Sequence, residues 1–250
     1  TFRAQHNQQK STAAGHVLDD NVFGSFESDA FRRDFTVNAL YYCATDERVL
    51  DPTDQGLNDL ASKQLRLIGD PATRFKEDPV RMLRAIRFKS KLKFDLAPIL
   101  EQKIIDLAHL LGEIPPARLF EETLKLFMAG FAQSTYLALC QYQISGILFP
   151  TMAEEGRAEA LIQLALKSTD DRIANGSPVT PAFIFAALLW APFEHLKKAL
   201  IEKDDYSRND AAAVAADQVF YQQQAVISIP KRFSIPAREI WLLQDRLEAR

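Results

Sequence analysis

The chain has 250 residues, of which 47% are hydrophobic, and its 33 acidic and 30 basic side chains give a net charge of −3. This size and hydrophobic content suit one large or two modest globular domains and exclude a chain that is disordered throughout. The pI of about 5.9 excludes a uniformly basic surface, so any surface that binds nucleic acid must be local. Basic residues gather between Arg81 and Lys93, around Arg118 and around Lys231.

Cysteine and histidine usage indicates a reducing compartment. Cys43 and Cys140 lie far apart with no CxxC motif, and the four histidines are scattered, which predicts neither disulfides nor a Cys/His metal site. The longest apolar run, residues 183–191, is shorter than the roughly 20 residues that a membrane helix needs, so we expect a buried helix there. We therefore expect a cytoplasmic protein without a membrane segment. The first residue is Thr1 and not Met, which suggests a truncated sequence.

In chain order, the first 70 residues are predicted to mix short helices and strands. Residues 1–3 resemble the end of an extended segment, residues 5–20 a mobile polar loop, and residues 21–31 contain a helical turn. Dense apolar residues predict a short buried helix over 37–44. Residues 48–50 and 65–68 are predicted strands, and between them Gly56 permits a tight turn before a short helix.

A helix is predicted to begin at Glu77-Asp78-Pro79, because proline suits a first helical turn and acids complement the helix dipole. Asp78, Arg81, Arg84 and Arg87 then recur every three residues opposite an apolar face. An Asp and an Arg one turn apart offer an acceptor and forked donors, which suits the flat edge of a nucleic-acid base. On spacing alone, a solvated basic face with internal Asp-to-Arg pairs is the commoner outcome.

After residue 94 the pattern is helical almost throughout. Helices are predicted over residues 96–111, 116–128 and 136–142, and prolines and glycines divide the remainder into further helices. No alternating apolar pattern predicts a sheet in this part. We interpret the apolar stripes as core.

Three blocks in order carry a resemblance: RRDFTVNAL at 32–40, DPTDQGLNDL at 51–60 and EDPVRMLRAIRF at 77–88. Together they resemble the nucleotidyltransferase family that holds bacterial poly(A) polymerases and the bacterial and eukaryotic type of CCA-adding enzyme. The resemblance implies an α/β partial nucleotidyltransferase head followed by a mainly α-helical neck and body.

The resemblance also implies three parts of the chain. Residues 1–70 would form the C-terminal part of the head, residues 71–125 a helical neck that reads the nucleotide and binds RNA, and residues 126–250 a helical body. Asp51, Gly56 and Asp59 would lie at a hinge between head and neck, although an ordinary strand-turn-helix connection explains the same residues.

Site residues follow from the same resemblance. It places Asp34 in the active-site carboxylate set, as a candidate metal ligand near the sugar of the nucleotide, with Arg33 facing ribose or phosphate. It assigns Asp78 and Arg81 to the adenine edge, and Arg84 and Arg87 to phosphate or to stabilising their helix. Without the resemblance, a carboxylate after two arginines is most often part of a local ion pair. The side chains of Thr36 and Asn38 are as well suited to capping and turn roles as to additional hydrogen bonds in the site.

The implied reaction is attack of an RNA 3′-hydroxyl on the α-phosphate of ATP, with Mg²⁺ as the metal. Family members carry an Asp-x-Asp pair that the 250 residues lack. We therefore expect the main metal-binding pair to lie outside this chain, and the chain alone not to catalyse transfer.

Three functions stay open at this point. The stretch IPPARLFEETLKLF and the late Ile229-Pro230-Lys231-Arg232 favour the poly(A) polymerase branch over the CCA-adding branch. The missing Asp pair also suits a noncatalytic helical module that binds RNA. RNA 3′ ends and ATP are the expected partners, and the sequence leaves the oligomeric state open.

Overall fold

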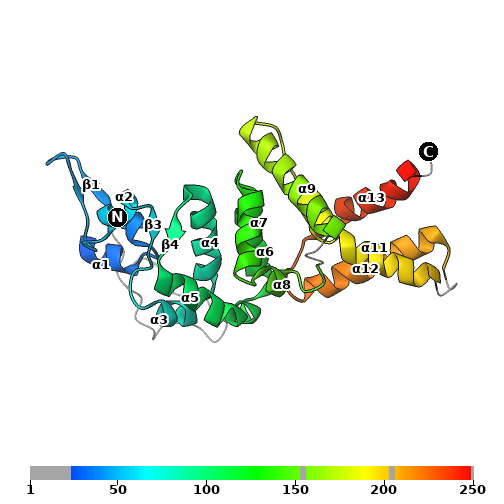
Figure 1. Ribbon diagram of the computed structural model, residues 1–250, viewed down its shortest axis with the longest axis horizontal. Helices are drawn as coiled ribbons and strands as arrows, with labels where there is room; N and C mark the ends of the chain where they lie inside the picture. The colour runs from blue at the N-terminus through cyan, green and yellow to red at the C-terminus, as the bar shows by residue number, and fades with distance from the viewer. Residues whose placement is uncertain (1–23, 153–155, 203–205, 249–250) are drawn as a thin grey trace.

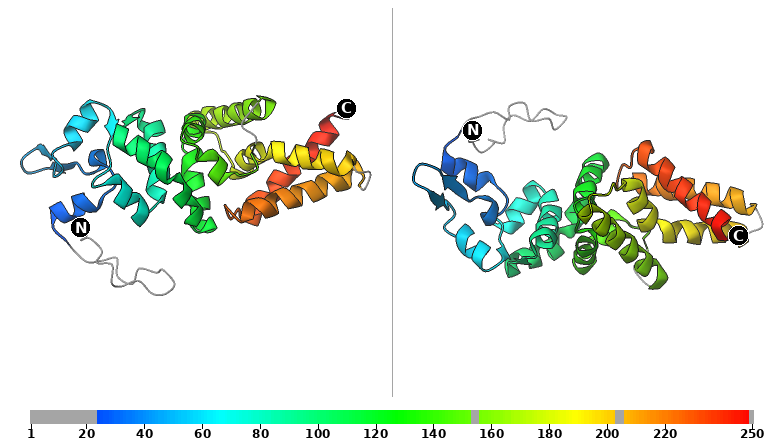
Figure 2. Two further views of the ribbon diagram at one scale, coloured as in Figure 1. Left: turned by 60° about the horizontal axis from the view of Figure 1, so that its bottom comes forward. Right: turned by 90° about the horizontal axis from the view of Figure 1, so that it is seen from above.

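The computed structural model describes residues 24–152, 156–202 and 206–248 (Figure 1). The segments predicted at residues 1–3 and 5–20 lie outside these ranges. The molecule is elongated, with the short N-terminal elements at one end and the last helices at the other (Figure 2). Within the described residues the strands form only two small two-stranded sheets, and all other elements are helical. This confirms the predicted α/β head followed by a mainly helical remainder.

The N-terminal part confirms one prediction and corrects another. The helical turn is α1 (Phe26–Arg32), whose first turn is capped by the Ser25 hydroxyl accepting from the backbone N–H of Ser28. The helix predicted over 37–44 is wrong. That segment contains a short 3-10 helix, η1 (Thr36–Asn38), and then β1 (Tyr41–Cys43), which pairs antiparallel with β2 (Arg48–Leu50). Short apolar runs do not distinguish strand from helix, and this one has a hairpin partner close by.

Gly56 starts α2 (Gly56–Ala61), and close packing explains the glycine better than a turn does. A Cβ atom there would lie 2.8 Å from both Leu40 Cδ2 and the Thr36 carbonyl oxygen. Gly56→Ala should therefore lower the free energy of unfolding by about 1–3 kcal/mol through overpacking, measured by urea denaturation. Gly146→Ala is the matched control, because nothing lies within 4 Å of its added Cβ and its stability should stay equal or rise slightly. Equal stability of the two variants would refute this explanation.

The predicted helix after residue 77 is preceded by a helix that the sequence analysis missed. α3 (Pro71–Glu77) begins with Pro71 in its first turn, and the Asp70 carboxylate accepts from the backbone N–H of Thr73 at 2.8 Å. An Asp-Pro pair is a typical helix start, but it also ends an extended segment such as the strand predicted over 65–68. That strand is β3 (Gln64–Leu65), which pairs in parallel with β4 (Asp95–Leu96). α4 (Val80–Leu92) follows α3 directly.

The remaining helices confirm the helical prediction, with changed bounds. The helix expected over 96–111 is divided into β4, α5 (Pro98–Leu107) and a 3-10 segment η2 (Ala108–Glu113). The others are α6 (Pro116–Phe127), α7 (Ala132–Gln141), α8 (Ser145–Leu148), α9 (Gly156–Ala174), α10 (Pro181–Leu188), α11 (Trp190–Glu202), α12 (Arg208–Gln224) and α13 (Lys231–Glu248). No helix within the described ranges is long and apolar enough to cross a membrane.

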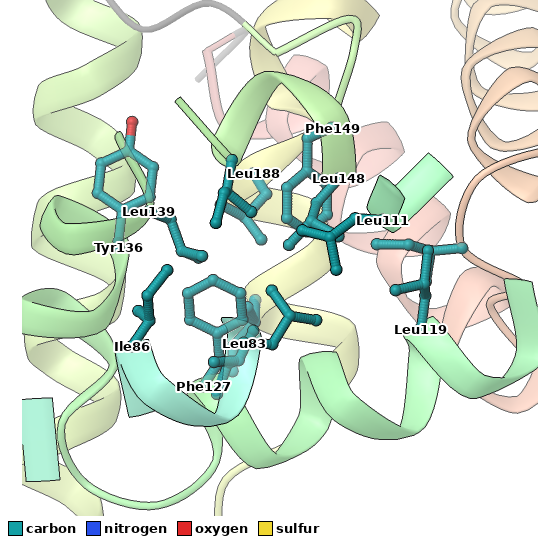
Figure 3. Packing of buried hydrophobic residues seen from close by; sticks show 14 of the residues in the cluster. Leu83, Ile86, Leu111, Leu119, Phe127, Tyr136, Leu139, Leu148, Phe149 and Leu188 are labelled. Carbon is teal, nitrogen blue, oxygen red and sulfur yellow. The ribbon is translucent and has the colours of Figure 1, made fainter. Parts of the chain in front are cut away.

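One buried cluster orients α4. Leu83 and Ile86 of α4 pack with Phe127 of α6 and with Tyr136 and Leu139 of α7, all of them buried (Figure 3). Because this apolar face is turned toward α6 and α7, Arg81 and Arg84 lie on the side of α4 that faces Asp34 and the start of α6. The amphipathic pattern of α4 therefore positions the candidate site.

Candidate nucleotide site

A polar cleft of about 650 Å³ lies between the end of α1, α4 and α6. Five arginines and three acidic residues line it, which gives an excess of positive charge suited to a polyanionic ligand. The lining residues are Arg32, Arg33, Asp34, Asn38, Asp78, Val80, Arg81, Arg84, Phe88, Arg118 and Glu122. All the residues predicted for the nucleotide are among them except Arg87.

Asp34 joins the first and third sequence blocks. Its nearly buried carboxylate accepts from Arg84 Nε at 2.6 Å, and its other oxygen accepts from the Phe35 backbone N–H at 3.0 Å and from Asn38 Nδ2 at 3.2 Å. The ion pair thus spans 50 residues of sequence. The two preceding arginines pair with Asp29 and Asp34 pairs with Arg84, so the local ion pair expected from spacing alone is not what holds this carboxylate.

Those two arginines are held by Asp29 of α1 instead. Asp29 is 3% exposed and accepts from Arg32 Nη2 at 2.6 Å, from Arg33 Nη2 at 3.0 Å and from the Tyr41 hydroxyl at 2.7 Å. Burial lowers the pKa of Arg33, but the hydrogen bond and charge of Asp29 outweigh it, so the pKa lies above its ordinary value. Asp29 is not among the residues predicted for the site, although its spacing of three and four residues from the arginines favours such pairs on a helix.

Asp78 and Arg81 do not bond to each other through their side chains. Asp78 precedes Pro79, which favours an extended backbone, and its φ of −151° separates α3 from α4. Both oxygens of its carboxylate accept from Arg118 Nη2 of α6, at 2.8 and 2.9 Å. Arg81 Nη1 donates to Glu77 Oε2 at 3.0 Å and to the Arg74 carbonyl at 2.7 Å. Sequence reasoning treated Arg118 only as part of a basic surface.

Two further arginines support the site from outside the cleft. Arg74 Nη2 donates to the carbonyls of Arg32 and Arg33, at 3.1 and 2.8 Å, and so fixes the backbone that leads to Asp34. Burial and the neighbouring Arg81 lower the pKa of Arg74. Arg87 lies over the Phe88 ring, and burial and Arg84 lower its pKa. Of its two predicted roles, this placement suits stabilisation of the helix.

The predicted hinge residues lie outside the cleft and hold the segment between α1 and α3. Asp51 accepts from the backbone N–H of Thr53 and Leu57, which caps the start of α2. Asp59 is 3% exposed and accepts from the Thr36 hydroxyl at 2.7 Å and from Arg66 Nε at 3.1 Å. Hinge motion at these residues stays a prediction.

Family profiles match three parts of the chain. They are described as the "Poly A polymerase head domain" at residues 1–66, the "Probable RNA and SrmB- binding site of polymerase A" at 93–155 and the "Polymerase A arginine-rich C-terminus" at 204–250. Poly(A) polymerase I of Escherichia coli O6:H1 is 44% identical over 263 residues, covering 100% of this chain and 56% of the relative. The chain belongs to the bacterial poly(A) polymerase family.

Other members and neighbours of this family are also similar. Poly(A) polymerase I of Haemophilus influenzae is 45% identical over 259 residues, covering 99% of this chain and 57% of that protein. A CCA-adding enzyme of Lactobacillus johnsonii is 38% identical over 189 residues, covering 76% of this chain and 44% of that protein. The chain spans about half the length of the poly(A) polymerases that it matches.

Solved structures share the fold at low sequence identity. A CCA-adding enzyme in its apo form II has a TM-score of 0.67 and 19% identity, covering 100% of this chain and 53% of that one. A tRNA nucleotidyltransferase in complex with a primer tRNA and an incoming ATP analogue has a TM-score of 0.62 and 23% identity, covering 92% and 60%. These likenesses bear out the predicted fold, a partial nucleotidyltransferase head followed by a helical body.

Proposed function

We propose that this chain is the nucleotide-reading and RNA-reading part of a polynucleotide adenylyltransferase, which adds AMP from ATP to RNA 3′ ends. In this reaction the RNA 3′-hydroxyl loses its proton to solvent and its oxygen bonds to the α-phosphorus of ATP. The bond from that phosphorus to the oxygen shared with the β-phosphorus breaks, and pyrophosphate leaves. The observation that carries the proposal is the convergence of Asp34, Asp78 and Arg84, from two distant sequence blocks, on one arginine-rich cleft.

The cleft offers separate groups for the base and the phosphates. Nε and Nη2 of Arg81 have no hydrogen-bond partner within the described ranges, so they can donate to a ligand. Asp78 supplies an acceptor at the same cleft. Adenine and cytosine each present an amine beside a ring-nitrogen acceptor, whereas guanine and uracil present a carbonyl beside an N–H. An acceptor next to a donor therefore favours adenine and cytosine.

The relatives support adenine over the combined use of cytosine and adenine. The identity to poly(A) polymerases extends over the whole chain, whereas the CCA-adding relative covers 76% of it at lower identity. One structural neighbour binds a primer tRNA and an ATP analogue. By analogy we propose ATP and an RNA 3′ end as the ligands of this chain. The proposed division into residues 1–70, 71–125 and 126–250 assigns the cleft to the junction of the first two parts.

The described residues do not form a site for the proposed Mg²⁺. Within them no three His, Cys, Asp or Glu side chains gather where a metal ion could bind. Asp34 is engaged by Arg84, Asn38 and a backbone N–H. The roles proposed for this chain are therefore binding and orientation. Asp78 and Arg81 hold the base edge, Arg33 and Arg84 hold sugar and phosphate, and Asp34 faces the sugar near the reacting hydroxyl.

Calorimetric titration of the 250-residue chain with ATP, GTP and CTP tests the proposal. ATP should bind at least about tenfold more tightly than GTP, since a matched base edge contributes about 1–3 kcal/mol. Arg81→Gln should weaken ATP binding, whereas Arg48→Gln, whose exposed side chain is not among the residues that line the cleft, should not. Undetectable ATP binding, or GTP binding as tightly as ATP, would contradict the proposal.

A further inference from the structure

Four lysines surround the point where α4 ends and β3 and β4 begin. Lys89 and Lys91 lie in the last turn of α4, Lys93 caps its C-terminus, and Lys63 directly precedes β3. The Lys93 backbone N–H donates to the Lys89 carbonyl. Because β3 and β4 pair in parallel, the Asp95 N–H donates to the Lys63 carbonyl at 2.9 Å. The strand pair thus brings together lysines that are 30 residues apart in sequence, and we call these four residues the lysine cluster.

The charge of the lysine cluster is not balanced by its neighbours. Lys89 lies 3.7 Å from Asp95, whose side chain is 94% exposed. Lys63, Lys91 and Lys93 are exposed, and within the part of the chain that the structure describes they have no ion-pair partner. Four positive charges therefore meet one negative charge, in a chain whose net charge is −3. Such a local excess of positive charge favours a polyanionic ligand.

Two members of the lysine cluster stand where glycine would cost less. Lys63 and Lys93 both have a left-handed backbone, with φ of 55°. A Cβ atom crowds the backbone in this conformation, so glycine is the usual residue there, and above all at the C-terminal end of a helix. A lysine at both positions lowers stability and adds charge. This indicates that the ammonium groups themselves are used.

One helix connects the lysine cluster to the cleft. Arg84, which lines the cleft, and Lys91 are seven residues, or about two helical turns, apart and therefore lie on the same side of α4. The rise of an α-helix puts Lys93 about 18 Å from Arg81 along the axis. A single strand of RNA whose 3′ end occupies the cleft therefore reaches the lysine cluster a few nucleotides upstream of that end.

We propose that the lysine cluster binds phosphates of the single-stranded RNA that precedes the 3′ end. This inference rests on the proposed function for the identity of the polymer, and it adds a contact region outside the cleft. Lysine suits this role, because its ammonium group binds phosphate as a point charge without a fixed orientation. Contacts to phosphates position a strand and carry no sequence information, so the lysine cluster holds RNA of any sequence.

The competing explanation is that these lysines only complement the dipole at the C-terminal end of α4. It accounts for Lys89 and Lys91, which lie in the last helical turn. It does not account for Lys63, which precedes a strand and is not part of this helix. The two explanations also predict different results, because a residue that serves only the helix dipole does not change the salt dependence of RNA binding.

Titration with oligo(A) of about 12 nucleotides over a range of salt concentrations tests the proposal. Lys63→Gln combined with Lys93→Gln should weaken binding about tenfold at low salt and reduce the slope of log affinity against log salt by about 1.4, since single strands contribute about 0.7 per phosphate contact. Lys167→Gln combined with Lys198→Gln removes the same charge from exposed positions on α9 and α11, and should change the slope less than half as much. ATP affinity should be equal in all three proteins, because none of these lysines lines the cleft.

Lys93→Gly separates loss of the charge from damage to the fold. Glycine relieves the left-handed backbone, so this variant should unfold at a higher urea concentration than the wild-type chain. It should nevertheless bind oligo(A) more weakly, because it lacks the ammonium group. A loss of affinity that accompanies a gain in stability does not come from unfolding.

The possible failures point to different errors. If the Lys63 and Lys93 variants lose no more oligo(A) affinity than the control, the lysine cluster serves only the fold, and the proposed function stands. If the wild-type chain does not bind oligo(A), the inference and the RNA part of the proposed function both fail. If it binds oligo(A) but not ATP, the nucleotide part of the proposed function fails, while the salt slope still decides on the lysine cluster.

Discussion

Replacing Trp241 with alanine should lower the free energy of unfolding by about 3–5 kcal/mol, the largest stability effect that we expect in this chain. Trp241 is 1% exposed on α13, and its ring stacks on Phe193 of α11 and Phe220 of α12, with ring centroids 4.6 and 5.1 Å away. Its Nε1 donates to the Ala186 carbonyl of α10 at 2.9 Å. One side chain therefore joins four helices, and its removal leaves a cavity among all of them. Urea denaturation followed by circular dichroism measures the change.

Trp241→Phe separates packing from the hydrogen bond. Phenylalanine keeps an aromatic ring for Phe193 and Phe220 but does not donate to Ala186, so we expect a loss of about 1–2 kcal/mol. The ranking of wild type, Trp241→Phe and Trp241→Ala is the decisive result. An alanine variant as stable as the phenylalanine variant would show that the stacked rings do not hold these helices together.

Asp34→Asn should reduce adenylyl transfer about a hundredfold or more while leaving ATP affinity intact or higher. A carboxylate placed at the reacting hydroxyl typically contributes a factor of that size. Binding should not suffer, because the substitution removes a negative charge from a phosphate site and releases Arg84, which the Asp34 carboxylate now holds. Transfer is measured in a chimera in which this chain replaces the matching segment of the Escherichia coli relative, and affinity is measured by titration.

A loss of adenylyl transfer without a loss of ATP affinity identifies Asp34 as a residue of the reacting centre. Asp46→Asn is the control, since Asp46 pairs with Arg48 on an exposed surface and should change neither quantity. If Asp34→Asn weakened ATP binding and transfer to the same extent, Asp34 would be a binding residue, and its assignment to the reacting centre would be wrong. Unfolding curves of the two variants exclude a general loss of structure as the cause.

The residues that line the candidate cleft are largely the ones predicted from the sequence, because most of them lie in motifs. The period of three from Asp78 to Arg87 predicted the polar face of α4, and the structure places Arg81 and Arg84 of that face in the cleft. The partners of these residues were not predictable, because they come from distant parts of the chain. Arg84 pairs with Asp34 across 50 residues and Arg118 with Asp78 across 40 residues. Local periodicity carries no information about such pairs.

The errors in the fold have local causes. The strand at Tyr41–Cys43 has three residues and was mistaken for part of a helix, because so short an apolar segment has no measurable period. α3 was missed because Asp70-Pro71 both ends the preceding extended segment and caps the following helix. Long amphipathic segments such as α4 and α6 are predicted correctly as helices. Their apolar faces are buried in one cluster, and this burial gives their apolar residues a helical spacing in the sequence.

Photoaffinity labelling with an ATP analogue that carries an azide on the adenine ring tests the location of the site most directly. The account predicts crosslinks to peptides within residues 74–88 and 116–122, where Asp78, Arg81 and Arg118 meet at the cleft, and their loss when excess ATP is added. Arg118→Gln should shift or weaken the crosslinks in residues 116–122 first. Competable crosslinks confined to residues 156–248 would place the nucleotide elsewhere and contradict the account.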